Sequence, residues 1–219
     1  MSVAFNDTAF NDTASAEADP LITWQRLRSG NERSFAPVRG PRGGLTDVRP
    51  AAAVFRCADA GLASETVFGQ SWGSLIDVST WGHVVDSSVV STLEYAVDTL
   101  EVPLIVVLGH DGCHAVRSAV RAWDEAALPS GAARTTIEQI FGSIVRRNVS
   151  TDSIGDVTTA HIIETGLSLL DRSPAIAARV EAGRCGIVCA TVRPEDGRIK
   201  TYATVGSVGE PAENLLECV

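Results

Sequence analysis

Short apolar runs alternate with segments of helical periodicity along most of the chain. Four runs rich in Val, Ile and Ala are too short for helices and predict strands buried on both faces, as in a parallel sheet: residues 51–56, 75–79, 102–108 and 186–192. Apolar positions at helical spacing predict helices over residues 20–29, 63–69, 86–100, 115–126, 158–170 and 173–182, with a weaker pattern over 129–155. This alternation predicts an α/β fold with a mainly parallel central sheet flanked by helices.

The end of the chain has the pattern of a hairpin. The strand over residues 186–192 is followed by a turn at residues 194–197 and by a second strand over residues 199–205. We therefore expect an antiparallel C-terminal hairpin at the edge of the sheet.

The pattern divides the chain into three parts. Residues 1–19 contain a short tandem repeat of small, polar and acidic residues, and we expect this tail to be disordered or ordered only against a partner. Residues 20–36 form a predicted N-terminal helical arm, and residues 37–219 form a single α/β domain that begins in a Pro- and Gly-rich connection.

The helical arm has its own start and stop signals. Asp19 is the expected N-cap, with Pro20 in the first helical position, and Gly30 is the expected end of the helix. Its apolar positions are Leu21, Trp24 and Leu27. A short helix cut off from its domain cannot bury such residues alone, which predicts a homodimer or a dimer of dimers.

Composition excludes several classes of protein. The chain has 219 residues and a net charge of −9, so nucleic acid and anionic membranes are disfavoured as partners. No apolar run is long enough to predict a membrane span, and no signal peptide is visible. The odd number of cysteines (57, 113, 185, 189 and 218) argues against a disulfide framework and favours a reduced, cytoplasmic protein with metal-binding and core thiols.

Two of the predicted strands end in residues that bind metals. The first is followed by Cys57 and Asp59, and the third by His110 and Cys113. If the strands are neighbours, two thiolates, one imidazole and one carboxylate converge, a set that suits Zn²⁺. We predict Cys57, His110 and Cys113 as ligands, with a water in the fourth position, and Asp59 either orienting that water or binding the metal itself.

The same residues carry a resemblance to a known family. The chain resembles the β-class carbonic anhydrases from about Trp24 to Gly209, with matching stretches at residues 30–35, 54–59, 91–97 and 102–113. The resemblance implies reversible hydration of carbon dioxide to bicarbonate by zinc-bound hydroxide. It also implies an intertwined dimer or dimer of dimers, Cys57, His110 and Cys113 as ligands, and Asp59 as the water-orienting carboxylate.

Several positions depart from the family pattern. The family reads Cys-x-Asp-x-Arg, and here the arginine position is Gly61, which has no side chain to pair with Asp59. Other polar or small positions near the substrate also differ, namely Val48, Ser74, Ser79, Trp81 and His114. We expect Trp81 to crowd the pocket.

These departures leave alternatives open. In one, the protein is a hydratase whose Asp59 is held by another donor such as Arg56 or a partner residue. In another, Asp59 binds zinc as a fourth ligand and leaves a closed site of low activity, with a binding or regulatory role. In a third, the protein is a zinc hydrolase of a sulfur analogue of carbon dioxide.

The remaining titratable residues have ordinary interpretations. His83 is expected to be hydrogen-bonded or on the surface, His114 to have a structural or surface role with proton transfer as an alternative, and His161 to be structural. Cys185 and Cys189 are expected in the core, with Cys218 in an exposed tail.

Overall fold

The computed structural model describes residues 19–33, 49–209 and 213–214. The expectations for residues 1–18, for the connection within 34–48 and for Cys218 lie outside this part of the chain. Among the described residues, no helix is long and apolar enough to cross a membrane.

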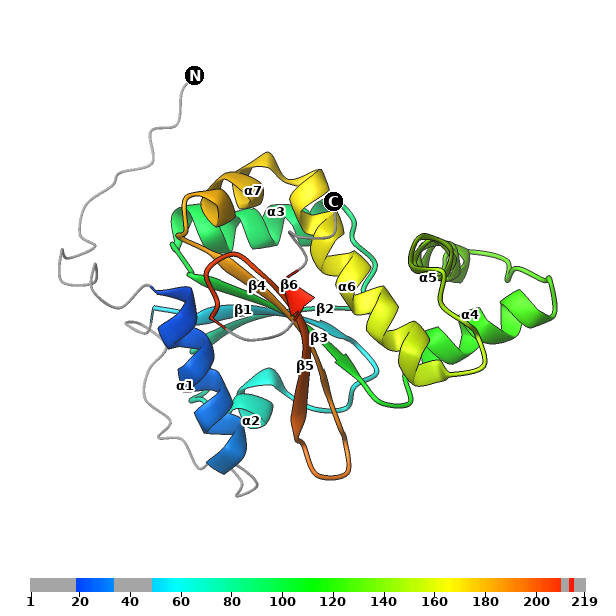
Figure 1. Ribbon diagram of the computed structural model, residues 1–219, viewed down its shortest axis with the longest axis horizontal. Helices are drawn as coiled ribbons and strands as arrows, with labels where there is room; N and C mark the ends of the chain where they lie inside the picture. The colour runs from blue at the N-terminus through cyan, green and yellow to red at the C-terminus, as the bar shows by residue number, and fades with distance from the viewer. Residues whose placement is uncertain (1–18, 34–48, 210–212, 215–219) are drawn as a thin grey trace.

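A six-stranded sheet forms the centre of the molecule, in the order β2-β1-β3-β4-β5-β6 (Figure 1). The strands are β1 Ala52–Cys57, β2 Leu75–Thr80, β3 Leu104–His110, β4 Gly186–Val192, β5 Ile199–Val205 and β6 Glu213–Asn214. Strands β1 to β4 pair in parallel, and β5 runs antiparallel to β4. The predicted α/β fold and hairpin are therefore confirmed. The short β6 adds parallel to the outside of the hairpin.

Helices cover both faces of the sheet. They are α1 Pro20–Arg33, α2 Ser64–Phe68, α3 Ser87–Glu94 with its π-helical extension η1 Tyr95–Thr99, α4 His114–Asp124, α5 Ala133–Arg147, α6 Ile154–Arg172 and α7 Pro174–Glu181. Figure 1 shows α3, α6 and α7 on one face, α1 and α2 on the other, and α4 with α5 projecting beyond the sheet. The buried apolar residues accordingly form one cluster on each face and a third under α4 and α5. The third cluster includes Cys57 and Cys113, so it packs against the candidate site.

The N-terminal helix differs from the prediction at its end. Asp19 caps it as expected, because its Oδ1 accepts the backbone N–H of Ile22 at 3.1 Å. The expectation that Gly30 ends the helix is wrong, since α1 continues to Arg33. A Cβ at Gly30 would lie 1.9 Å from the carbonyl oxygen of Phe68, so this glycine is a contact point where α1 approaches α2 closely.

The burial of α1 also corrects the argument for a partner. Trp24 and Leu27 are both fully buried within the one chain, Trp24 against Phe68 with ring centroids 6.3 Å apart. The premise that these side chains need a partner subunit to be buried is therefore wrong, because α2 and the sheet supply the surface that covers them.

The weakly periodic stretch before α6 contains a longer regular helix than its sequence pattern indicated. It contains the fifteen-residue helix α5, whose apolar residues Ile137, Ile140 and Ile144 are buried. Helix α6 begins at Ile154, earlier than predicted, with Ser153 as its N-cap. The side-chain hydroxyls of Thr158 and Thr159 bond to carbonyls one turn back, which lets polar residues fill the first turns of this helix.

Candidate metal centre

Two adjacent strands end at the candidate site. β1 and β3 pair in parallel, with Arg56 opposite Leu108, so Cys57 and His110 leave the sheet at the same edge. Cys113 follows as the N-cap residue of α4, and Asp59 lies in the turn after β1. One ligand atom from each of these four residues lies within 4.8 Å of the others. The convergence predicted from the strand ends is thus present.

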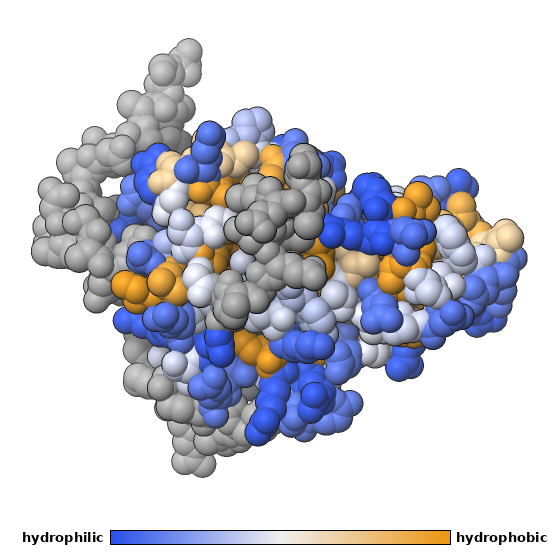
Figure 2. Space-filling model, in the orientation of Figure 1, coloured by the Kyte–Doolittle hydropathy of each residue, from blue (hydrophilic) through white to orange (hydrophobic). Residues whose placement is uncertain are grey.

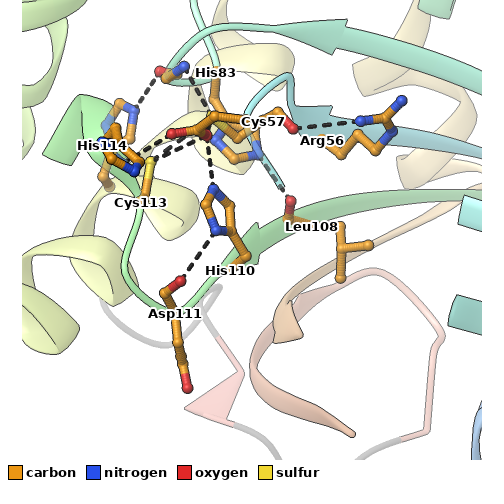
Figure 3. A network of polar contacts seen from close by, with 11 residues as sticks. Arg56, Cys57, His83, Leu108, His110, Asp111, Cys113 and His114 are labelled. Atoms are coloured by element: carbon orange, nitrogen blue, oxygen red, sulfur yellow. Dashed lines mark hydrogen bonds and ion pairs between the residues drawn. The ribbon is translucent and has the colours of Figure 1, made fainter. Parts of the chain in front are cut away.

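The separation of the two sulfurs fits zinc. Cys57 Sγ and Cys113 Sγ are 3.7 Å apart, and two sulfurs bound at ~2.3 Å with tetrahedral angles would be about 3.8 Å apart. Asp59 Oδ1 lies 2.6 Å from Cys57 Sγ and 2.8 Å from His110 Nε2. Figure 3 shows Cys57, Cys113 and His110 turned toward one another. Two sulfurs, one imidazole nitrogen and one carboxylate oxygen form a donor set that zinc accepts.

The orientation of His110 is set by its backbone surroundings. Its Nδ1 lies 3.1 Å from the carbonyl oxygen of Asp111, an acceptor that requires the proton on Nδ1 (Figure 3). Nε2 therefore faces the sulfurs and Asp59. A second ring nitrogen bonded to a carbonyl is the usual way in which proteins orient a metal-binding histidine.

The four groups shift one another's proton affinities. Burial alone would raise the pKa of Asp59, but hydrogen bonds from Cys57, the His114 backbone and His110 lower it. Burial alone would lower the pKa of His110, but hydrogen bonds with Cys57 and Asp59 raise it. The hydrogen bond between the two thiols raises the pKa of Cys57 and lowers that of Cys113, so Cys113 is the sulfur that loses its proton first.

Asp59 is held from its other side by the start of α4. Its Oδ2 accepts the backbone N–H of His114 at 2.8 Å, while Oδ1 points to the ligand cluster. The proposed helper Arg56 is absent from this arrangement, because its Nε bonds both oxygens of Asp77 at 3.0 Å. The alternative in which Arg56 holds Asp59 is therefore wrong. Consecutive residues of a strand point to opposite faces, so Arg56 leaves β1 on the side away from Cys57 (Figure 3).

Two further contacts near the site were not anticipated from the sequence. The backbone N–H of Gly82 donates to Cys57 Sγ at 3.1 Å, and the carbonyl of the same residue lies 2.9 Å from His161 Nε2. A backbone donor leaves no signal in the residue types, and His161 lies far along the chain on α6. The other histidines follow their ordinary interpretations: His83 is buried with Nε2 3.1 Å from the Leu108 carbonyl, and His114 is exposed.

Trp81 lies beside the same region. It is partly buried and packs against the cluster formed by α4 and α5, which also contains Cys57 and Cys113. Its backbone carbonyl accepts the hydroxyl of Thr136 at 3.4 Å. The side chain therefore packs against the same apolar cluster as two of the predicted ligands.

Comparison with known proteins identifies the family. The family model described as "Carbonic anhydrase" matches residues 52–199. A carbonic anhydrase of Mycolicibacterium smegmatis is 40% identical over 202 residues, covering 88% of this chain and 98% of the relative. The chain belongs to the β-carbonic anhydrase family. Carbonic anhydrase 2 of Mycobacterium tuberculosis is 38% identical over 201 residues, with 88% and 97% of the two chains covered.

Solved structures agree at the level of the fold. A β-carbonic anhydrase of Coccomyxa in complex with acetazolamide has a TM-score of 0.62 at 21% identity, covering 71% of this chain and 73% of that one. One of two tetrameric β-carbonic anhydrases from Sordaria macrospora has a TM-score of 0.62 at 19% identity, covering 71% and 81%. The family is one of zinc enzymes, and the donor set fits that metal. These matches favour a carbonic anhydrase over the regulatory and sulfur-analogue alternatives.

Proposed function

We propose that Cys57, His110 and Cys113 hold the zinc ion of a carbonic anhydrase that interconverts carbon dioxide and bicarbonate, with Asp59 controlling the remaining coordination position. The observation that carries this proposal is the convergence of four donor atoms within 4.8 Å at the ends of β1 and β3. Bound at such a site, zinc lowers the pKa of a water to ~7 and so supplies a nucleophile at neutral pH.

The protein buries the three predicted ligands almost completely. The exposed fractions of Cys57, Cys113 and His110 are 0%, 3% and 4%, so the three ligands sit in an environment from which bulk water is largely excluded. In such surroundings the charges of the thiolates and the metal interact more strongly than at a surface. Each ligand is also anchored by the backbone: Cys57 ends a central strand, His110 ends its neighbour, and Cys113 begins α4.

Asp59 contacts both the ligand cluster and the start of α4. Its Oδ1 lies among the ligand atoms, at hydrogen-bonding distances of 2.6 Å from Cys57 Sγ and 2.8 Å from His110 Nε2, and its Oδ2 accepts the His114 N–H. We propose that Asp59 occupies the fourth position at rest and that rotation about its side-chain bonds, with Oδ2 kept on α4, opens that position to water. Gly61 offers no guanidinium to draw Asp59 away from the ligand cluster, and Oδ2 accepts the backbone N–H of His114.

We also propose that the protein works as an oligomer, either a homodimer or a dimer of dimers. β2 is an edge strand of the sheet, paired only with β1 among the described strands. Figure 2 shows hydrophobic residues among the hydrophilic ones on the face in view, and the exposed large ones on or between α4 and α5 are Trp123, Leu128 and Val145. The tetrameric enzymes of Sordaria macrospora give a precedent for assembly within this fold. A cytoplasmic location stays a prediction.

Stopped-flow hydration of carbon dioxide by zinc-loaded protein tests the proposed function. Zinc content is measured alongside for Cys57→Ser, His110→Ala and Asp59→Asn. We expect the first two to lose both zinc and activity, because each removes one of three strong donors. Asp59→Asn is expected to keep zinc, since three ligands remain. A wild-type protein that carries one zinc per chain yet does not accelerate hydration would contradict the proposal.

A further inference from the structure

His161 is a buried histidine with a specific partner on each ring nitrogen. Its exposed fraction is 3%; Nε2 lies 2.9 Å from the carbonyl oxygen of Gly82, and Nδ1 lies 2.9 Å from Ser143 Oγ. Burial lowers the pKa of His161, so the ring is neutral and carries one N–H. The Gly82 carbonyl can only accept a hydrogen bond, so that N–H is on Nε2, and Nδ1 accepts from the hydroxyl of Ser143, which also lies 3.2 Å from the Gln139 carbonyl.

The residue that His161 contacts is itself bonded to a metal ligand. Gly82 donates its backbone N–H to Cys57 Sγ at 3.1 Å. Two hydrogen bonds thereby connect three distant parts of the chain. They run from His161 on α6 to Gly82 in the turn after β2, and from Gly82 to Cys57 at the end of β1. The contact bridges 79 residues of sequence on one side and 25 on the other.

Gly82 has no side chain, so its orientation is set through its two peptide groups, and the Trp81 carbonyl in the first of them accepts the Thr136 hydroxyl at 3.4 Å. The Gly82 φ of +69° is in the left-handed region, which glycine adopts freely. A Cβ at this position would lie 2.4 Å from Thr136 Cγ2 and 2.8 Å from Ala115 Cβ, so no side chain fits to pin the turn. The hydrogen bond from His161 to the Gly82 carbonyl fixes the second of the two peptide groups that meet at this flexible residue.

We propose that His161 is a positioning residue for the zinc site, which aims the Gly82 N–H at the Cys57 sulfur. The inference rests on the proposed role of Cys57 as a ligand. A hydrogen bond from an amide to a ligand sulfur stabilises the negative charge that the sulfur carries and holds the sulfur in position. It also reduces the electron density that the sulfur donates to the metal. Partners of this kind, outside the ligands themselves, typically change metal affinity by ~10- to 100-fold.

The test replaces the ring while keeping its bulk. His161→Phe fills similar space and removes the N–H, whereas His161→Gln places an amide N–H near the position of Nε2. We expect the phenylalanine variant to bind zinc about tenfold more weakly in competition with a chromophoric chelator. In the cobalt-loaded protein its thiolate-to-metal charge-transfer band should move to longer wavelength, because the sulfur has lost a hydrogen bond. The glutamine variant should restore both values toward the wild type.

Thr165→Val is the matched control. Thr165 is buried one turn further along α6, and its hydroxyl donates only to the His161 carbonyl at 2.8 Å. This variant loses a buried polar contact on the same helix without touching Gly82, so its zinc affinity and cobalt spectrum should stay at wild-type values. An effect in Thr165→Val equal to that in His161→Phe would overturn the proposal, as would a glutamine variant as weak as the phenylalanine one.

A measurement on the wild-type protein keeps the proposal testable if His161→Phe does not fold. In protein loaded with an NMR-active cadmium isotope, the Gly82 amide proton should show scalar coupling to the metal through the hydrogen bond to sulfur. A folded, cadmium-loaded protein without this coupling would refute the inference and leave the proposed function intact. Failure of the wild-type protein to bind metal would overturn both.

Discussion

Gly61→Arg restores the residue type that the family places two positions after Asp59, and its effect follows from the local geometry. Gly61 has a φ of +68°, and no atom lies within 4 Å of a Cβ built there. The guanidinium therefore has room, but the backbone conformation costs an L-residue about 1–2 kcal/mol. For a chain of this size 1 kcal/mol lowers Tm by about 2–4 °C, so we expect a loss of about 2–8 °C.

The same substitution should increase hydration activity. Asp59 has a side chain that is 20% exposed, and a hydrogen bond to a charged group at such a site contributes about 1.5–3 kcal/mol. A guanidinium that competes for Asp59 shifts the carboxylate away from the ligand cluster. Since 1.4 kcal/mol corresponds to a factor of ten, a contribution of about 1.5–3 kcal/mol corresponds to an expected gain in hydration rate of about 10- to 100-fold at neutral pH.

Two controls separate the charge from the backbone strain. Gly61→Ala introduces the strained Cβ without the guanidinium. Gly183→Arg introduces an arginine at a position that also has a φ of +68° and open space, far from the site in sequence. Stopped-flow rates and zinc content are measured for all three variants. If Gly61→Arg is folded, holds full zinc and is no more active than Gly61→Ala, the view that Asp59 limits the reaction is refuted.

Two predictions concern stability. Gly30→Ala should lower the free energy of unfolding, measured by urea denaturation, by about 1–3 kcal/mol, because its Cβ would meet the Phe68 carbonyl. Gly155→Ala on α6 should be neutral or stabilising, because a Cβ there would meet only Ser153 Oγ at 3.8 Å, and equal effects of the two substitutions would contradict the close contact at Gly30. Burial, with the nearby His161, lowers the pKa of His83 to about 3. As the pH drops from about 6.5 toward 3, His83 therefore takes up a proton in the unfolded chain but not in the folded one. The free energy of unfolding should fall over this range by up to about 1.4 kcal/mol per pH unit. His83→Asn suits the φ of +54° and should give a flatter fall in denaturation measured at several pH values; parallel curves for the two proteins would show that His83 does not titrate this way.

The strand ends explain why much of the site was predictable. Short apolar runs mark buried strands, and parallel neighbours end at one edge, so Cys57 and His110 were expected to converge, as the structure places them. The α/β class and the hairpin followed from the same periodicities. The sequence did not decide whether Asp59 orients a water or binds the metal itself. In the structure one of its oxygens faces the ligand cluster and the other accepts an N–H of α4.

The errors have a common physical origin in contacts between distant segments. Glycine is typical of a helix end, but tertiary packing against Phe68 makes Gly30 an interior residue of α1. Arg56 was considered as a partner of Asp59 from its nearness in sequence, although the alternation of a strand turns it toward Asp77. The donor to Cys57 is a backbone group, and its support comes from His161 on α6, which no local pattern indicates.

Diffraction at the zinc absorption edge, on crystals of the zinc-loaded protein near neutral pH, tests the central claim most directly. We expect one anomalous peak per chain at the ends of β1 and β3, ~2.3 Å from Cys57 Sγ and Cys113 Sγ and ~2.0–2.1 Å from His110 Nε2. A peak elsewhere in a fully loaded protein, or a zinc ion not bonded to these three atoms, would contradict the account.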